Sequence, residues 1–135
     1  MHNRHAMEPV DIKLILLVAT GGAIGSVLRY LVQGYLTRGD FPWGTFAVNI
    51  IGSFLISLIF FYLSQGTGLT PEFRAFMFIG IFGGFTTMSS FSLDTVALFI
   101  EGQWLWALGN IILNGGLCVI GAFLGRAVGL LLGGY

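Results

Sequence analysis

Hydrophobic residues fill four long stretches of this chain, and polar residues gather in the short segments between them. About twenty apolar residues, at about 1.5 Å of helix rise each, cross the roughly 30 Å hydrocarbon core of a bilayer. A window of about nineteen residues therefore predicts four transmembrane helices, at residues 12–33, 44–64, 72–99 and 103–131. This pattern indicates an all-α membrane protein made of spans and tight turns.

The segments between the spans carry residues that begin helices or anchor them in the membrane. In LTRGDFPWG, Trp43 is placed to anchor the next span at the membrane interface. In SQGTGLTPE, Thr70 is the predicted N-cap of the third span and Pro71 its first helical residue.

The first eleven residues are predicted to be an N-terminal leader, and residues 12–135 a four-span membrane channel domain. The start MHNRHAMEPV lacks the apolar core and small-residue cleavage site of a signal peptide. Met7 is a candidate native start behind an added leader.

Composition supports a membrane location. Of 135 residues, 56% are hydrophobic and 9% charged, whereas a soluble domain carries roughly 25% charged residues. Lysine and arginine number six, as do aspartate and glutamate, so no basic field exists to bind nucleic acid. We therefore expect a lipid bilayer as partner, no nucleic acid, and a multi-pass protein of the inner (plasma) membrane.

Glycines recur every fourth residue near the end of the chain and cluster in the first span. Small residues at this spacing let two helix backbones approach closely in lipid. Close helix packing is the predicted role of both sets, which are Gly121, Gly125, Gly129 and Gly133, and Gly21, Gly22 and Gly25.

Polar residues inside the spans fall on single helical faces, because they recur every four residues. Interhelical hydrogen bonding and a wet path explain the serines equally well. A functional role is favoured for the asparagines, because each buried amide has four hydrogen-bonding sites to satisfy. The two stripes are Thr45, Asn49, Ser53 and Ser57 in the second span, and Asn110, Asn114 and Cys118 in the fourth.

Charged residues within the spans lie away from the middle of the membrane. Arg29, near the end of the first span, can reach the interface or anchor a polar vestibule, and Asp94 lies nearer an interface than the midplane. Proton-coupled carriers usually hold an acid or a histidine inside the membrane. The chain offers no strong candidate for that role.

The third span contains GGFTTMSSFS, residues 83–92, whose paired glycines and hydroxyl residues weaken a helix in lipid. A helix break is therefore predicted near its centre. Met88 and Phe91 are three residues apart and share a helical face. The positive edge of a phenyl ring, with amide and hydroxyl donors, can coordinate a small anion without a fixed charge, which suits the weak binding that conduction needs.

Three motifs together resemble the Fluc family of fluoride channels: GGAIGSVLRY, GTFAVNIIGS and GGFTTMSSFS, in this order. The resemblance runs from Leu14 through nearly the whole chain. It implies a small dual-topology channel, an antiparallel homodimer with two pores, and export of fluoride that entered as HF, giving fluoride resistance. Family pores use phenylalanine edges and a second-span asparagine, which correspond to Phe91 and Asn49 here.

The resemblance also implies a structural sodium ion at the dimer centre. Its ligands would be the backbone carbonyls of Gly83 and Thr86, at the break in the third helix. The family has phenylalanine where this chain has Met88. With fluoride as the permeant ion and Arg29 in a vestibule, the expected anion pathway comprises Asn49, Phe91, Met88, Ser90, Thr45, Asn110 and Asn114.

Charge placement gives almost no bias in orientation. Lys13, Arg74 and Arg126 lie near span ends on the side of both termini, against Arg29 and Arg38 on the other side. Three against two is a weak signal for the rule that places positive loops in the cytoplasm. We therefore expect insertion in both orientations and an antiparallel homodimer whose third helices meet at the symmetry axis.

Other functional classes fit the sequence less well. A small multidrug-resistance-type exporter has four short spans but needs a carboxylate within the membrane, and Glu8 and Asp11 precede the first span. A structural membrane protein explains the glycines but not two neutral polar stripes. An enzyme is not expected, because the spans contain no Ser/His/Asp, Cys/His or metal-ligand cluster.

Overall fold

The structure is a computed structural model that describes residues 10–134, and this range is helical without strands. The predicted leader therefore lies mostly outside the described residues, as does Tyr135. The elements are α1 (Ile12–Leu36), α2 (Trp43–Leu63), α3 (Pro71–Phe73), η1 (Arg74–Phe82), α4 (Gly83–Phe85), α5 (Met88–Ile100) and α6 (Trp104–Leu132).

Four stretches are long and apolar enough to cross a membrane: α1, α2, the run Pro71–Ile100 that joins α3 to α5, and α6. Each predicted span agrees with one of these within three residues at both ends. The four-helix prediction is confirmed.

The predicted start of the third span is also confirmed. The Thr70 hydroxyl oxygen accepts a hydrogen bond from the Phe73 N–H at 3.2 Å, and Pro71 is the first helical residue. At α1, the Asp11 carboxylate accepts from the Lys13 N–H at 2.9 Å. Both caps satisfy N–H groups that lack a partner within the first helical turn.

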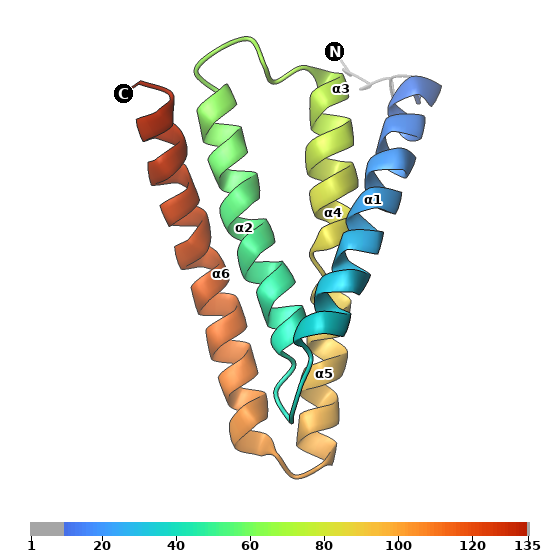
Figure 1. The fold of residues 1–135 in the computed structure, drawn as a ribbon, viewed down its shortest axis with the longest axis vertical. Coiled ribbons are helices and arrows are strands. Elements are labelled where there is room, and N and C mark those ends of the chain that lie inside the picture. Colours follow the sequence, from blue (N-terminus) through green and yellow to red (C-terminus); the bar gives the residue numbers. More distant parts are fainter. Residues whose placement is uncertain (1–9, 135) are drawn as a thin grey trace, which may run out of the picture.

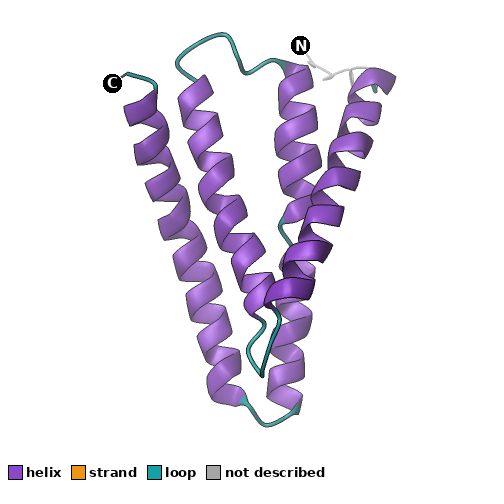
Figure 2. Cartoon of the chain, viewed as in Figure 1, coloured by secondary structure: helices purple, strands orange, loops and turns teal. Residues whose placement is uncertain are grey.

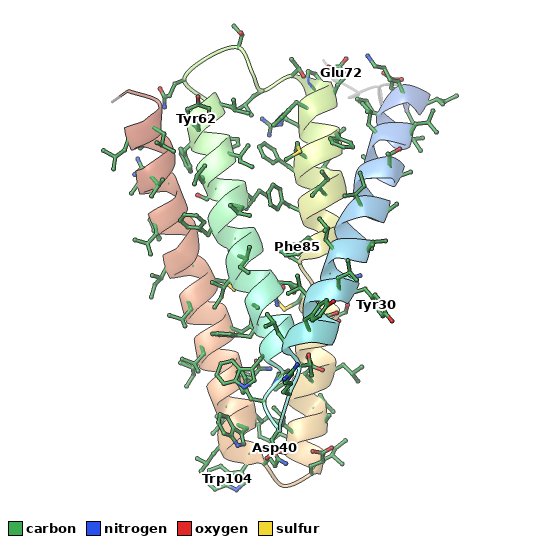
Figure 3. The ribbon with its side chains drawn as sticks, viewed as in Figure 1. Tyr30, Asp40, Tyr62, Glu72, Phe85 and Trp104 are labelled. Atoms are coloured by element: carbon green, nitrogen blue, oxygen red, sulfur yellow. The ribbon has the colours of Figure 1, made fainter. Side chains whose placement is uncertain are left out.

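The helices form two closely packed pairs (Figure 1): α2 lies along α6, and α1 lies along η1 and α4. Short loops join them (Figure 2), and the start of α1 and the end of α6 lie at the same end of the bundle. Figure 3 shows Tyr62 and Glu72 at this terminal end, and Asp40 and Trp104 at the opposite end.

Glycines allow the close contact of α2 with α6. A Cβ atom added at Gly125 would collide with the carbonyl oxygen of Phe54, and one added at Gly129 would lie 2.5 Å from that of Leu58. Such distances are far below van der Waals contact, so only glycine fits. The packing role predicted for these two residues is confirmed.

Glycines also allow the close contact of α1 with the third span. A Cβ atom at Gly21 or Gly25 would collide with the carbonyl oxygens of Phe76 and Ile81, respectively. At Gly22, in contrast, a Cβ atom would meet nothing within 4 Å. The Gly22 carbonyl oxygen nevertheless lies only 2.6 Å from the position of a Cβ atom at Gly84, so the two backbones approach closely there as well.

The third span departs from a regular α-helix at two places. Residues 74–82 form a π-helix, an uncommon geometry that often accompanies functional sites. Thr86 (φ −84°, ψ 157°) and Thr87 (φ −152°, ψ 111°) have extended backbones, although the span bends by only 12°. The chain therefore leaves helical geometry for two residues while continuing in almost the same direction.

Candidate functional site

One amide holds the extended segment of the third span. Asn49 Oδ1 accepts from the Thr87 N–H at 2.8 Å, and Asn49 Nδ2 donates to the Thr87 carbonyl at 3.1 Å. Buried backbone groups outside a helix need such partners, and Thr87 is only 5% exposed. The Asn49 side chain of α2 thus replaces helical hydrogen bonds that are missing from the third span at Thr87.

The extended segment leaves two carbonyl oxygens without their usual helical donors. In a continuous α-helix the Thr87 N–H would bond the Gly83 carbonyl, but it donates to Asn49 instead. The Ser90 N–H would bond the Thr86 carbonyl, but it donates to Thr87 Oγ1 at 3.1 Å. The Thr86 carbonyl instead faces Arg29, whose Nη1 lies 3.5 Å away.

These two carbonyls fit the chemistry of a hard cation. Within residues 10–134, no three His, Cys, Asp or Glu side chains cluster as metal ligands. Sodium and calcium accept backbone carbonyl oxygens as ligands, and a carbonyl freed from a helix presents an oriented dipole. The Arg29 guanidinium, whose Nη1 lies 3.5 Å from the Thr86 oxygen, opposes a cation there.

A chain of neutral hydrogen bonds runs from Asn49 into α6 and back to α5. Asn49 Nδ2 donates to Asn114 Oδ1 (3.2 Å), Asn114 Nδ2 to Asn110 Oδ1 (3.2 Å), and Asn110 Nδ2 to Thr95 Oγ1 (2.9 Å). Asn110 is fully buried. Cys118 Sγ also donates to Asn114 Oδ1, at 3.7 Å. The buried amides are therefore satisfied by one another.

A pocket of about 520 Å³ lies between the α2–α6 pair and the third span. It brings together Asn49, Met88, Phe91 and Asn114 of the predicted pathway, beside the predicted sodium ligands. Its complete lining carries no charged side chain. It comprises Asn49, Gly52, Ser53, Ile56, Phe78, Phe82, Gly83, Thr86, Thr87, Met88, Phe91, Asn114, Gly115, Cys118 and Val119.

Three further residues of the predicted pathway lie outside this pocket. Thr45 donates to Asp94 Oδ2 at 2.7 Å and accepts from Gln33 Nε2 at 3.1 Å. Asn110 lies behind Asn114 in the hydrogen-bonded chain. Ser90 Oγ accepts from Thr87 Oγ1 at 3.1 Å, which makes it part of the turn that begins α5.

Sequence reasoning missed two residues of the site. Thr87 connects Asn49 to the extended segment, and Thr95 is the acceptor for Asn110. Both are hydroxyl residues in the third span, and Thr87 stands directly before an apolar helix start, as N-caps do. The third-span hydroxyls were a usable signal for both, whereas the pairing of Thr87 with Asn49 and of Thr95 with Asn110 has no signal in local sequence.

Comparison with known proteins shows a consistent set of relatives. Residues 16–126 match the family described as CrcB-like protein, Camphor Resistance (CrcB). A Rhizobium meliloti (strain 1021) protein named Fluoride-specific ion channel FluC is 45% identical over 117 residues, covering 84% of this chain and 94% of the relative. A protein of the same name from Shewanella baltica (strain OS155 / ATCC BAA-1091) is 44% identical over 115 residues, covering 83% and 92%.

Proposed function

The chain belongs to the CrcB family, and we propose that it is a fluoride-selective channel that conducts passively. It is a multi-pass integral membrane protein, of a type that in bacteria resides in the inner membrane. The relatives named above are called fluoride-specific ion channels, and this chain matches 94% and 92% of their length. Fluoride that enters a cell as HF and loses its proton inside would leave through such a channel down its gradient.

The uncharged lining of the pocket is the observation that carries this proposal. It combines the amides of Asn49 and Asn114 with phenylalanine rings, among them Phe91. Amide N–H groups and ring edges offer positive partial charge to an anion without a full positive charge. An ion bound in this way can leave again, as conduction requires.

Apart from Thr45, the proposed pathway comprises groups that line the pocket or bond to residues that do. Asn49, Phe91 and Met88 would line it within the pocket, and Asn114 and Asn110 would extend it along α6. Thr45 lies nearer the loop end, where its hydroxyl donates a hydrogen bond to Asp94 Oδ2, and Ser90 lies at the start of α5. Arg29 is proposed to set the potential of the vestibule.

The functional unit proposed is an antiparallel homodimer of dual topology. Met88 lines the pocket yet is 74% exposed, so one chain supplies only part of the wall around it. A second, inverted copy would complete the wall, and the two third spans would meet at the axis. A structural sodium ion would then be held by the Gly83 and Thr86 carbonyls of both copies, which the extended segment frees from helical bonding.

Cysteine labelling tests the topology. A cysteine placed at each terminus in turn, labelled from one side of intact membranes, should react in part of the population. Complete labelling or complete protection at either terminus would contradict dual topology, and neither result depends on which ion is conducted.

Liposome flux tests the proposed function. Reconstituted protein should pass fluoride much faster than chloride and should not move a lipophilic organic cation. Cation movement would instead support a small multidrug-resistance-type exporter.

Substitution of Met88 tests the role of ring edges. A thioether fills the volume of a phenyl ring but lacks its positive edge. Met88→Phe should therefore raise fluoride flux, whereas Met88→Ile, which adds bulk without a ring, should not. Equal flux through the Met, Phe and Ile forms, at equal amounts of protein, would show that this side chain only shapes the wall.

A further inference from the structure

We propose that two arginines at the terminal end of the bundle bind the phosphate groups of anionic membrane lipids. The site is a row of four side chains, Arg74, Phe60, Phe61 and Arg126, which we call the arginine–phenylalanine row. It lies outside the pocket described above. The proposal does not depend on the ion conducted or on the number of chains in the assembly.

The row is assembled from three helices. The Arg74 Cζ atom of η1 lies 5.8 Å from the ring centroid of Phe60 in α2, and the Arg126 Cζ atom of α6 lies 5.2 Å from that of Phe61. The two rings meet edge to face with centroids 5.2 Å apart. Cations within about 6 Å of a ring centroid are attracted by its negative face, so both guanidiniums are held in place rather than freely mobile.

Neither guanidinium is neutralised within the described part of the chain. The third cation at this end, Lys13, forms an ion pair with Glu72 at 3.2 Å. The side chains of Arg74 and Arg126 form no ion pair or hydrogen bond with any residue from 10 to 134. A guanidinium has five N–H donors in a rigid fork that matches phosphate oxygens, so both residues keep this binding capacity for a partner outside the chain.

The depth of the row places it at lipid headgroups. At the opposite end, Trp43 and Trp106 contact Phe41 with ring centroids 4.6 Å and 5.5 Å away, and such aromatic clusters mark a membrane interface. Arg126 follows Trp106 by 20 residues in one continuous helix. That length is about 30 Å of helix, which equals the thickness of the hydrocarbon core, so Arg126 reaches the other interface.

The surroundings favour a lipid over a free phosphate ion. On the membrane side of Arg126, α6 exposes the apolar side chains of Phe123 and Leu124, at 68% and 57% exposure. These provide contact for acyl chains below a bound headgroup. An anionic headgroup is preferred to a zwitterionic one, because choline adds a positive charge beside the phosphate. Each basic residue near such a surface contributes about 1 kcal/mol, or about a fivefold change in affinity.

Native mass spectrometry of the full chain, released from detergent and titrated with phosphatidylglycerol or phosphatidylcholine, tests the proposal. Wild type should prefer phosphatidylglycerol. Arg126→Gln should weaken its binding about fivefold, and Arg74→Gln/Arg126→Gln more than tenfold. The matched control is Arg38→Gln, which removes an exposed arginine from the opposite end and should stay within twofold of wild type.

Two additions identify the ligand chemistry. Phe61→Leu keeps both charges but removes the ring that holds Arg126, so it should weaken phosphatidylglycerol binding less than Arg126→Gln does. Inorganic phosphate in excess should not displace the lipid. Equal phosphatidylglycerol affinity in wild type and the double variant, an equal loss in Arg38→Gln, or displacement by inorganic phosphate would each overturn the proposal.

Discussion

Replacing Asn49 with alanine tests whether this amide holds the extended segment of the third span. The change removes three hydrogen bonds, two to the Thr87 backbone and one to Asn114 Oδ1. It leaves the Thr87 N–H, in a residue that is 5% exposed, without a protein partner. We therefore expect the segment to open more often, even where the four spans remain inserted.

The size of the effect follows from the number of bonds lost. A hydrogen bond between membrane helices contributes about 0.6 kcal/mol on average, and a typical one in a soluble protein about 1 kcal/mol. Three bonds therefore contribute about 2 to 3 kcal/mol. Because 1.4 kcal/mol is a factor of ten, opening at Thr87 should become about 30 to 150 times more frequent.

Hydrogen–deuterium exchange of the Thr87 amide measures this opening directly. The matched control is Ser53→Ala, one turn further along α2, because Ser53 also lines the pocket but does not contact Thr87. Its exchange should stay within threefold of wild type. If Thr87 exchanges equally fast in the Asn49→Ala and wild-type proteins, Asn49 does not hold the segment, and the extended geometry has another cause.

Three further predictions concern the helix packing, the polar chain and an exposed ion pair. Gly125→Val should break the contact of α2 with α6 and lower the thermal midpoint, whereas Gly116→Ala, with open space at its Cβ position, should leave it unchanged or raise it. Asn110→Ala removes two buried hydrogen bonds and should cost about 2 kcal/mol in chemical unfolding, a result that an unchanged midpoint would contradict. Lys13→Gln breaks an exposed ion pair and should leave the free energy of unfolding almost unchanged, with a still smaller effect in high salt.

The four spans were predictable because each depends on local sequence. Apolar length fixes where a helix can cross lipid, and Thr70 with Pro71 supplies both signals of a helix start. The close packing at Gly125 was predictable for the same reason, because a four-residue repeat of glycines identifies one face of one helix. These features can be predicted without knowing which helix packs against that face.

The candidate site was only partly predictable, because its geometry depends on pairs of helices. Periodicity placed Asn49 and Asn114 on polar faces, yet gave no sign that the Asn49 side-chain amide forms hydrogen bonds with the Thr87 backbone. The π-helix at residues 74–82 likewise was not predicted from the sequence. The contact of Arg29 with the Thr86 carbonyl joins residues far apart in the sequence.

The hydrogen bonds that Asn49 already makes affect how an anion would pass through the proposed pathway. Its two amide hydrogens are directed to the Thr87 carbonyl and to Asn114 Oδ1, and its oxygen accepts from the Thr87 N–H. An anion therefore cannot fill an empty donor; it must replace a protein acceptor. Asn114 Oδ1 can release Asn49 and remain paired, because Cys118 Sγ also donates to it at 3.7 Å. The exchange trades one hydrogen bond for another, so the ion gains little net binding energy and leaves as readily as it enters.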